Sequence, residues 1–269
     1  MIAQTIGSFV VLIGIFLLAF NLEVKELGIA SNLNAVMIVL GGTFFATLLA
    51  YPIKKLVMTA MFLKQSFTSS KQIQWTIQTL VRLAQINKRN GIRALEIEGG
   101  KLPPGLINTG VGLISYQFSR ESVEQLLHKE ALANYNQCET AHKILCSMAK
   151  LAPAMGLDGT VVNLIRTFGH IGSPQNLIGY MGIALLSTFY GVVLANICFV
   201  PLSNKLKEFM DQDLLRMEMI QEGILDIFDQ EHPRAIQFKL ETLAGIQSEP
   251  YMPNISVVET TVQTSHGNG

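Results

Sequence analysis

The chain has 269 residues, of which 49% are hydrophobic and only 15% are charged, and its mean hydropathy is positive. Soluble domains carry about 25% charged residues, so this composition is typical of an integral membrane protein. The 20 basic and 20 acidic residues give a formal net charge of zero, and no basic stripe with interleaved aromatic residues occurs, which excludes an electrostatic surface for nucleic acids.

The first predicted element is a membrane span over residues 2–20, an uncharged run that is long enough to cross a bilayer at about 1.5 Å per residue. A cleaved signal peptide is the alternative. No basic segment precedes the run, however, and no small-residue cleavage motif follows it before Glu23, as a signal peptide would require. We therefore expect a retained span.

A short polar link leads to a second uncharged run over residues 35–53, which predicts a second span and a transmembrane hairpin within residues 1–53. The small residues Gly41, Gly42 and Ala46 allow another helix to approach closely. A helix that merely tolerates glycine is the alternative reading of the same residues.

Basic residues follow the second span directly, at Lys54, Lys55 and Lys64. Such an excess marks the cytoplasmic side of a membrane protein, so the N-terminus is predicted to be cytoplasmic as well. Residues 54–150 are polar and helical in pattern, which predicts a cytoplasmic helical domain.

Apolar residues in this domain recur at helical spacing and predict one buried stripe. Gly99–Gly100 and Pro103–Pro104 are expected to break the helices, and Ser119 is expected to cap the start of a long helix. The stripe consists of Ile73, Ile77, Leu80, Val81, Leu83 and Ala84.

No strong stop occurs in this long helix before Pro153, so we expect it to run from the cytoplasm into a third span over residues 151–171. Hydropathy alone misses this span because it contains Asp158, Asn163 and Arg166. A fourth uncharged run implies it, since an even number of crossings is needed to return the chain to the cytoplasm.

The fourth span is predicted over residues 177–200, and it closes a second transmembrane hairpin within residues 151–203. Residues 204–249 are expected to continue as one or two amphipathic cytoplasmic helices, and residues 250–269 to form a disordered tail. The apolar face of the cytoplasmic helices consists of Ile220, Ile224, Leu225, Ile227 and Phe228.

Side chains with catalytic or metal-binding chemistry do not form a recognisable pattern. Cys138, Cys146 and Cys198 lack paired metal-ligand spacing and are expected to be packed or free thiols. His128 and His142 are far from any nucleophile motif, and no glycine-rich phosphate loop is present. We therefore expect neither an enzyme nor a bound cofactor or metal.

Four segments carry a resemblance to a known family. They are APAMG-x-x-GT at residues 152–160, ALLSTFYG at 184–191, the stretch from Asn196 through Pro201, and KRNGIRALE at 88–96. On these motifs, and on the order of its elements, the chain resembles the MotA/PomA stator proteins of the bacterial flagellar motor, within the MotA/TolQ/ExbB superfamily. The resemblance covers residues 1 to about 243.

This resemblance implies an all-α protein of the bacterial inner membrane with four spans, the third and fourth of which continue into the cytoplasm. It implies an ion-conducting stator subunit that couples inward H⁺ or Na⁺ flow to torque on a rotor protein of the FliG type. The ion-carrying aspartate would belong to a single-span partner of the MotB/PomB type, in an assembly of five such chains around two partners.

Pro153 and Pro201 resemble the two functional prolines of the family, which couple ion passage to movement of the cytoplasmic domain. A proline removes one helical hydrogen bond and kinks a helix, which suits a hinge. The alternative is a proline that only ends a helix.

Thr160 and Thr188 resemble the hydroxyl residues that face the ion path in the family. An oxygen ligand can replace part of the hydration shell of an ion. The alternative is a hydroxyl that bonds a carbonyl of its own helix.

Lys88 and Glu96 match the family's arginine and glutamate that contact the rotor, and Arg89 or Arg93 could share this role. Lysine keeps the charge of arginine but loses its bidentate geometry. The alternative for all of these residues is an ordinary solvated surface.

Asp158 and Asn163 depart from the family, which has an aliphatic residue and a glycine at these positions. At 100° per residue, Asp158 lies about 160° around the helix from Thr160. We therefore expect Asp158 to point away from the ion path, and to be neutral or paired with a polar group on a neighbouring helix.

Other functions within the superfamily remain open. An ExbB/TolQ-like energiser of outer-membrane transport shares the pore helices, but such proteins have one span before the cytoplasmic domain, whereas two are predicted here. A related ion-driven complex for gliding, defence or surface transport is a further alternative. The sequence does not distinguish H⁺ from Na⁺.

Overall fold

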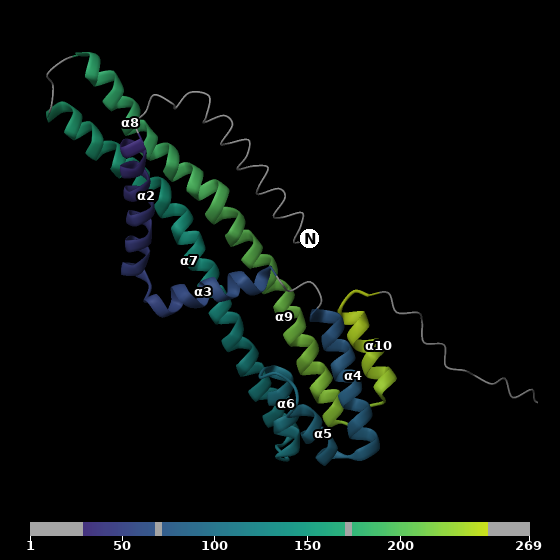
Figure 1. The fold of residues 1–269 in the computed structure, drawn as a ribbon. Helices are drawn as coiled ribbons and strands as arrows, with labels where there is room; N and C mark the ends of the chain where they lie inside the picture. Colours follow the sequence, from purple (N-terminus) through teal and green to yellow (C-terminus); the bar gives the residue numbers. More distant parts are fainter. Residues whose placement is uncertain (1–28, 68–71, 170–173, 247–269) are drawn as a thin grey trace, which may run out of the picture.

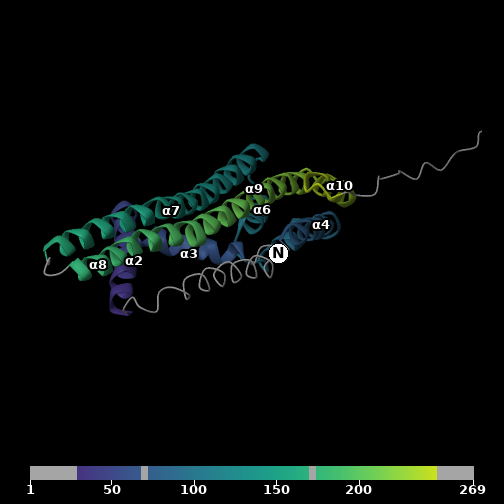
Figure 2. The same cartoon turned by 90° about the horizontal axis from the view of Figure 1, so that it is seen from above.

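The computed structural model describes residues 29–67, 72–169 and 174–246, and the fold of these residues is all-helical, as predicted. The predicted first span (2–20) and the predicted tail (250–269) lie outside the described residues. Two long helical segments lie side by side over most of the length of the molecule, and shorter helices pack along them (Figures 1 and 2).

The first long element is α7, Arg120–Gly169, with 50 residues. Its start is capped as expected, because the Ser119 hydroxyl accepts a hydrogen bond from the Ser122 amide at 3.3 Å. The helix then continues through Pro153. The prediction of a long helix that does not stop before Pro153 is thus confirmed.

The second long element consists of α8 (Pro174–Val193), the π-helix η2 (Leu194–Phe199) and α9 (Val200–Phe228), which follow one another without a break. Within η2, the Val200 amide donates to the carbonyl of Ala195, five residues earlier. Pro201 follows directly, inside the first turn of α9. Pro201 therefore does not end a helix, and that alternative reading of this proline is wrong.

The π-helix gives a physical reason for this continuity. A proline inside an α-helix lacks an amide hydrogen, and its ring collides with the carbonyl four residues earlier. A π-helical turn widens the backbone locally and changes which carbonyls are used. The widened turn before Pro201 lets the helix pass the proline.

At the other end of the chain, α2 (Ile29–Ala50) packs on α7 and α8, and α3 (Ile53–Ser66) packs on α7 and α9. The apolar part of α2 and α3 meet at an angle of 112°. The bend falls at Pro52, which has extended backbone angles and caps α3. The helix that covers most of the predicted second span thus ends at Ala50, just before this proline.

The small residues of α2 differ in their role. A Cβ atom on Gly42 would lie 2.8 Å from the sulfur of Met155 on α7, whereas a Cβ on Gly41 would meet no atom within 4 Å. Close helix approach therefore depends on Gly42. The simpler reading, a glycine that is merely tolerated, fits Gly41.

Four shorter helices gather around the N-terminal end of α7 and the C-terminal end of α9 (Figure 1). They are α4 (Gln72–Asn90), α5 (Ile92–Gly99), α6 (Leu106–Ser115) and α10 (Pro233–Leu243). The predicted stripe on α4 lies in their core. Its buried members are Ile77, Leu80, Leu83 and Ala84, and they pack with Ile220, Ile224, Leu225 and Ile227 of α9 among others.

A second core lies midway along the molecule, where α3 crosses the pair α7 and α9. It contains Cys138, Ala141, Leu145, Leu206, Phe209 and Met210, with Phe62 and Leu63 of α3 against it. Above this level, toward the α7–α8 end, the pair continues with α2 alongside it (Figure 1).

Among the described residues, Ala184–Phe228 forms one helix that is long and apolar enough to cross a membrane, and the bent pair α2–α3 meets the same test if it is counted as one span. The helix α7 does not meet it. Hydropathy therefore misses the predicted third span, as its polar residues led us to expect.

Candidate functional site

Two threonines meet where α7 and α8 pack together. Thr160 Oγ1 lies 2.5 Å from Thr188 Oγ1 and 2.9 Å from the carbonyl oxygen of Ala184 on α8. Thr160 is 8% exposed, and Thr188 is half-buried. The two residues that the resemblance paired in function are thus paired in space.

Each hydroxyl of the pair has a carbonyl acceptor on the other helix. Thr160 Oγ1 can donate to Ala184, and Thr188 Oγ1 lies 3.4 Å from the carbonyl oxygen of Gly156. Either hydroxyl can be the donor in the 2.5 Å contact between them. Thr160 Oγ1 also lies 3.1 Å from the carbonyl of Gly156 on its own helix. Thr160 therefore contacts a carbonyl of its own helix, as the alternative prediction stated, and it also joins α7 directly to α8.

The backbones of α7 and α8 approach closely beside this pair. A Cβ atom on Gly191 would lie 2.5 Å from the carbonyl oxygen of Ala152 and 3.1 Å from the Cα of Pro153. A Cβ on Gly156 would lie 2.8 Å from the carbonyl oxygen of Ser187. Only glycine fits at these two positions, and the contact places Pro153 against α8.

Sequence reasoning did not single out Gly156 or Gly191. Each is part of a quoted motif, but a glycine in a membrane helix becomes informative only when the partner helix and the crossing point are known. The same holds for Ser187, which is buried and accepts a hydrogen bond from the amide of Asn163 at 3.2 Å. Asn163 thus joins α7 to α8.

Asp158 lies on a different face of α7. Its side chain is exposed, while Thr160 is buried against α8, in agreement with the angle of about 160° between them. Among the described residues, its carboxylate has no hydrogen-bond or ion-pair partner. The expected polar partner on a neighbouring helix is therefore not found among the side chains that the structure describes.

The predicted rotor-contact residues lie at the opposite end of the molecule, around the turn between α4 and α5 (Figure 1). Lys88, Arg89, Arg93 and Glu96 are all exposed. Gly91 between the two helices has a φ of 76°, a backbone angle that favours glycine.

A neighbouring carboxylate is already paired. Glu98 accepts a hydrogen bond from Lys101 at 2.9 Å and forms an ion pair with Arg82. The hydrogen bond from Lys101, with the nearby Arg82 charge, lowers the pKa of Glu98. Glu98 is thus occupied within the chain, whereas Glu96 has no such partner among the described residues.

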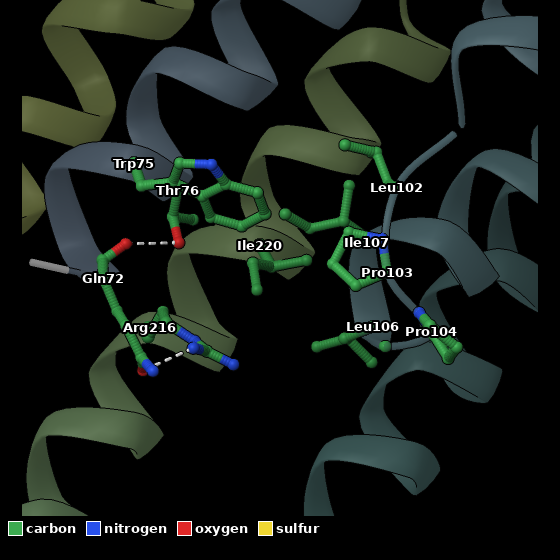
Figure 3. Close-up of a pocket in the computed structure, with 11 residues that line it drawn as sticks. Gln72, Trp75, Thr76, Leu102, Pro103, Pro104, Leu106, Ile107, Arg216 and Ile220 are labelled. Carbon is green, nitrogen blue, oxygen red and sulfur yellow. Dashed lines mark hydrogen bonds between the residues drawn. The ribbon is translucent and has the colours of Figure 1, made fainter. Parts of the chain in front are cut away.

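A cavity of about 330 Å³ lies between α4, α9 and the α5–α6 connection, away from Thr160 and Thr188 (Figure 3). Its wall is mainly apolar, with Trp75, Leu106 and Ile220 pointing toward its centre. Its one guanidinium, that of Arg216, donates to the Gln72 side chain at 2.6 Å and lies 3.3 Å from Asp213. The guanidinium is thus held by Gln72 and Asp213, although its Nε is buried without a hydrogen-bond partner.

Within the described part of the chain, no group of three His, Cys, Asp or Glu residues could hold a metal ion. The chemistry that the threonine site can support is therefore that of neutral oxygen ligands. Such ligands can contact a small cation or a water chain, but they carry no charge of their own.

Comparisons with known proteins show similar sequences and a similar fold. Residues 101–219 match the sequence model of the MotA/TolQ/ExbB proton channel family. The chain is 27% identical to motility protein A of Borreliella burgdorferi, over 85% of this chain and 88% of the relative. It is 25% identical to the chemotaxis protein PomA of Vibrio alginolyticus, over 80% and 85% of the two chains.

The structure superposes on the solved flagellar MotAB stator complex of Bacillus subtilis with a TM-score of 0.70 and 25% identity, covering 85% of this chain and 93% of the matched chain. The resemblance to the MotA/PomA proteins, first seen in short motifs, thus extends over most of both chains. Motility protein A and PomA match at similar identity, so these matches do not distinguish one type from the other.

Proposed function

We propose that this chain, which resembles the MotA/PomA stator proteins over most of its length, is the ion-conducting stator subunit of a flagellar motor in the bacterial inner membrane. It would couple inward flow of H⁺ or Na⁺ to torque on a rotor. The observation that carries this proposal is the contact between Thr160 and Thr188, 2.5 Å apart at a glycine-mediated crossing of α7 and α8.

The proposed topology has four spans with both termini in the cytoplasm. Residues 1–53 and 151–203 form two transmembrane hairpins, residues 54–150 and 204–249 form the cytoplasmic part, and 250–269 form a tail. The apolar helix Ala184–Phe228 and the bent pair α2–α3 support this order. The basic residues of α3 support the cytoplasmic position of the bend.

In the proposed assembly, a single-span partner of the MotB/PomB type contributes the carboxylate that carries the ion. The matched Bacillus subtilis structure is a complex of MotA with MotB, which supports such a partner. Five copies of this chain would surround two partners. The threonine pair would line the path beside the partner helix, because it supplies oxygen atoms but no charge.

Coupling would pass through the prolines. Pro153 touches α8 at Gly191, and Pro201 follows the π-helix in the next part of the same long element. π-helical turns and prolines are the sites at which helices bend. A structural change beside Thr160 and Thr188 would therefore alter the direction of the cytoplasmic parts of α7 and α9.

Torque would be delivered at the α4–α5 end. Lys88, Arg89 and Glu96 are exposed there, and their side chains have no partner among the described residues. They are thus available to charged groups of a rotor protein of the FliG type. The helix α7 connects this end of the molecule to Pro153. In the proposed motor, the cytoplasmic parts of α7 and α9 would therefore transmit movement to the rotor.

The test is motility in a strain whose only stator contains this chain and its own partner. We expect swimming to be restored. Speed proportional to sodium concentration at fixed pH would identify Na⁺, and indifference to sodium with sensitivity to a protonophore would identify H⁺. A correctly inserted complex that restores no motility under either gradient would contradict the proposal and favour an ExbB/TolQ-like energiser or another ion-driven complex.

A further inference from the structure

Three polar side chains meet between α7 and α9, about two helical turns before Pro153. Cys146 Sγ lies 3.0 Å from Ser203 Oγ and 3.5 Å from His142 Nε2. His142 Nδ1 lies 3.1 Å from the carbonyl oxygen of Ser203. Ser203 is 4% exposed, whereas Cys146 and His142 are partly exposed.

Ser203 offers His142 Nδ1 two partners, its carbonyl oxygen at 3.1 Å and its hydroxyl at 3.2 Å. The carbonyl oxygen only accepts, so in the neutral tautomer that uses it Nδ1 carries the hydrogen, and Nε2 has a lone pair that faces Cys146. The thiol then donates to Nε2, and the hydroxyl of Ser203 donates to the sulfur. Every donor in this group has an acceptor.

This arrangement is that of an activated nucleophile. A thiol becomes reactive when an adjacent base takes its proton and a third group orients the base. Here the base is His142, the orienting group is the Ser203 carbonyl, and the Ser203 hydroxyl can stabilise the thiolate that forms. The spacing of four residues between His142 and Cys146 on a predicted helix was the sequence feature that could have revealed the pair.

Another thiol of the same helix provides a contrast. Cys138 is 4% exposed, and burial, with the nearby Asp213 charge, raises its pKa to about 11. Its thiol therefore stays protonated at neutral pH.

We propose that Cys146 is a peroxide-reactive thiol that His142 activates as a general base. His142 takes the thiol proton, the sulfur attacks one oxygen of hydrogen peroxide, an S–O bond forms and the O–O bond breaks. The sulfur is oxidised by two electrons to a sulfenic acid, and the departing hydroxide takes the proton from His142 and leaves as water. Hydrogen peroxide is small enough to reach this sulfur, because Cys146 is partly exposed.

The consequence for movement rests on the proposed stator function. Sulfenic acid formation places an extra oxygen between α7 and α9, close to both prolines, where Ser203 and His142 already contact the sulfur. Overpacking of this kind displaces neighbouring groups. Oxidation of Cys146 should therefore slow rotation.

The chemistry is tested on membranes that hold the full chain with its partner. They are treated with hydrogen peroxide for set times and denatured, the remaining thiols are alkylated, and each cysteine is followed by mass spectrometry. We expect Cys146 to be oxidised at least about tenfold faster than Cys138, and His142→Gln to slow Cys146 by about tenfold. His128→Gln, an exposed histidine of the same helix, should change nothing. Equal rates at Cys146 and Cys138, or an unchanged rate in His142→Gln, would overturn the proposal.

A second variant separates chemistry from folding. Ser203→Ala removes the hydroxyl that donates to sulfur but keeps the carbonyl that orients His142, so Cys146 oxidation should slow while the amount of chain in the membrane stays at the parent level. In tethered cells, peroxide should slow the parent protein and not Cys146→Ala. If the labelling result holds and the rotation result fails, the link to the stator function is wrong and the reactive thiol stands.

Discussion

At the scale of single residues, the threonine pair joins α7 to α8. Thr160 Oγ1 contacts both the carbonyl of Ala184 and Thr188 Oγ1 on the neighbouring helix. Thr160 is buried, whereas Thr188 is half-buried. Thr188 is therefore the more exposed member of the pair.

A titration prediction concerns Asp226 on α9. Its Oδ1 accepts from Lys239 at 3.0 Å, but its Oδ2 is buried without a partner. Burial, the largest cause, raises the pKa of Asp226 above 3.8, against the lowering effect of Lys239. The folded state therefore disfavours the ionised form. This penalty is absent below pH 3.8, grows as the pH rises toward the folded pKa and is complete above it.

We accordingly expect Asp226→Asn to raise the unfolding temperature of the purified complex at neutral pH, with a gain that disappears below pH 3.8. Glu218→Gln is the control. Glu218 is exposed on the same helix, and its replacement should give no gain. A gain of equal size at acidic and neutral pH would show that burial of the charge is not its cause.

Residue roles could be predicted from the sequence only where a motif carried them. Thr160 and Thr188 were paired by resemblance, and the structure brings them into contact. His142, Cys146 and Ser203 were not connected in advance, because their meeting depends on how α7 and α9 lie side by side. The position of Asp158 away from Thr160 followed from helical geometry, but the expected polar partner of Asp158 is not found among the described side chains.

At the scale of elements, the crossing of α7 and α8 depends on the absence of side chains. Gly156 and Gly191 meet at the point where Pro153 contacts α8. The candidate site at Thr160 and Thr188 is thus held together by backbone contact between α7 and α8 rather than by charged side chains.

Gly191→Ala should therefore destabilise the complex. Its Cβ would lie 2.5 Å from the backbone oxygen of Ala152, and overpacking of this kind costs about 1–3 kcal/mol. Gly41→Ala is the matched control, because no atom lies within 4 Å of its Cβ and alanine favours a helix over glycine by about 1 kcal/mol. Thermal unfolding in detergent should separate the two variants; equal stability would contradict the close crossing.

The prediction of elements succeeded where length and polarity patterns determine them. The buried stripe of α4 and the long helix from Arg120 followed from spacing and capping. The helix that continues through Pro201 could not be predicted in this way. Proline normally stops a helix, but the π-helical turn before Pro201 lets the backbone pass the proline ring. Hydrophobic spacing and capping residues do not indicate a π-helical turn.

At the scale of the whole molecule, the site and the exposed charges lie at opposite ends of one pair of long helices (Figure 1). Charge reversal at the α4–α5 end should therefore leave the ion site intact and weaken only contact with the rotor. We expect Lys88→Glu and Glu96→Lys each to reduce swimming. A lost surface charge contact is worth about 1 kcal/mol, or about fivefold in rotor occupancy.

Lys129→Glu, on the exposed surface of α7, is the matched control and should swim at the parent speed. Swimming speed and the amount of chain in the membrane are measured together. If Lys129→Glu impairs swimming as much as the α4–α5 variants, the effect is one of net charge and the assigned rotor contact is wrong.

The central claim is that ions pass the hydroxyl pair between α7 and α8 and thereby drive rotation. The most direct test compares Thr188→Ser with Thr188→Val in tethered cells whose only stator contains this chain, with speed normalised to the amount of chain in the membrane. Serine keeps the hydroxyl, and valine keeps the shape without it. We predict rotation with serine and none with valine; rotation of the valine variant at the parent speed would contradict the account.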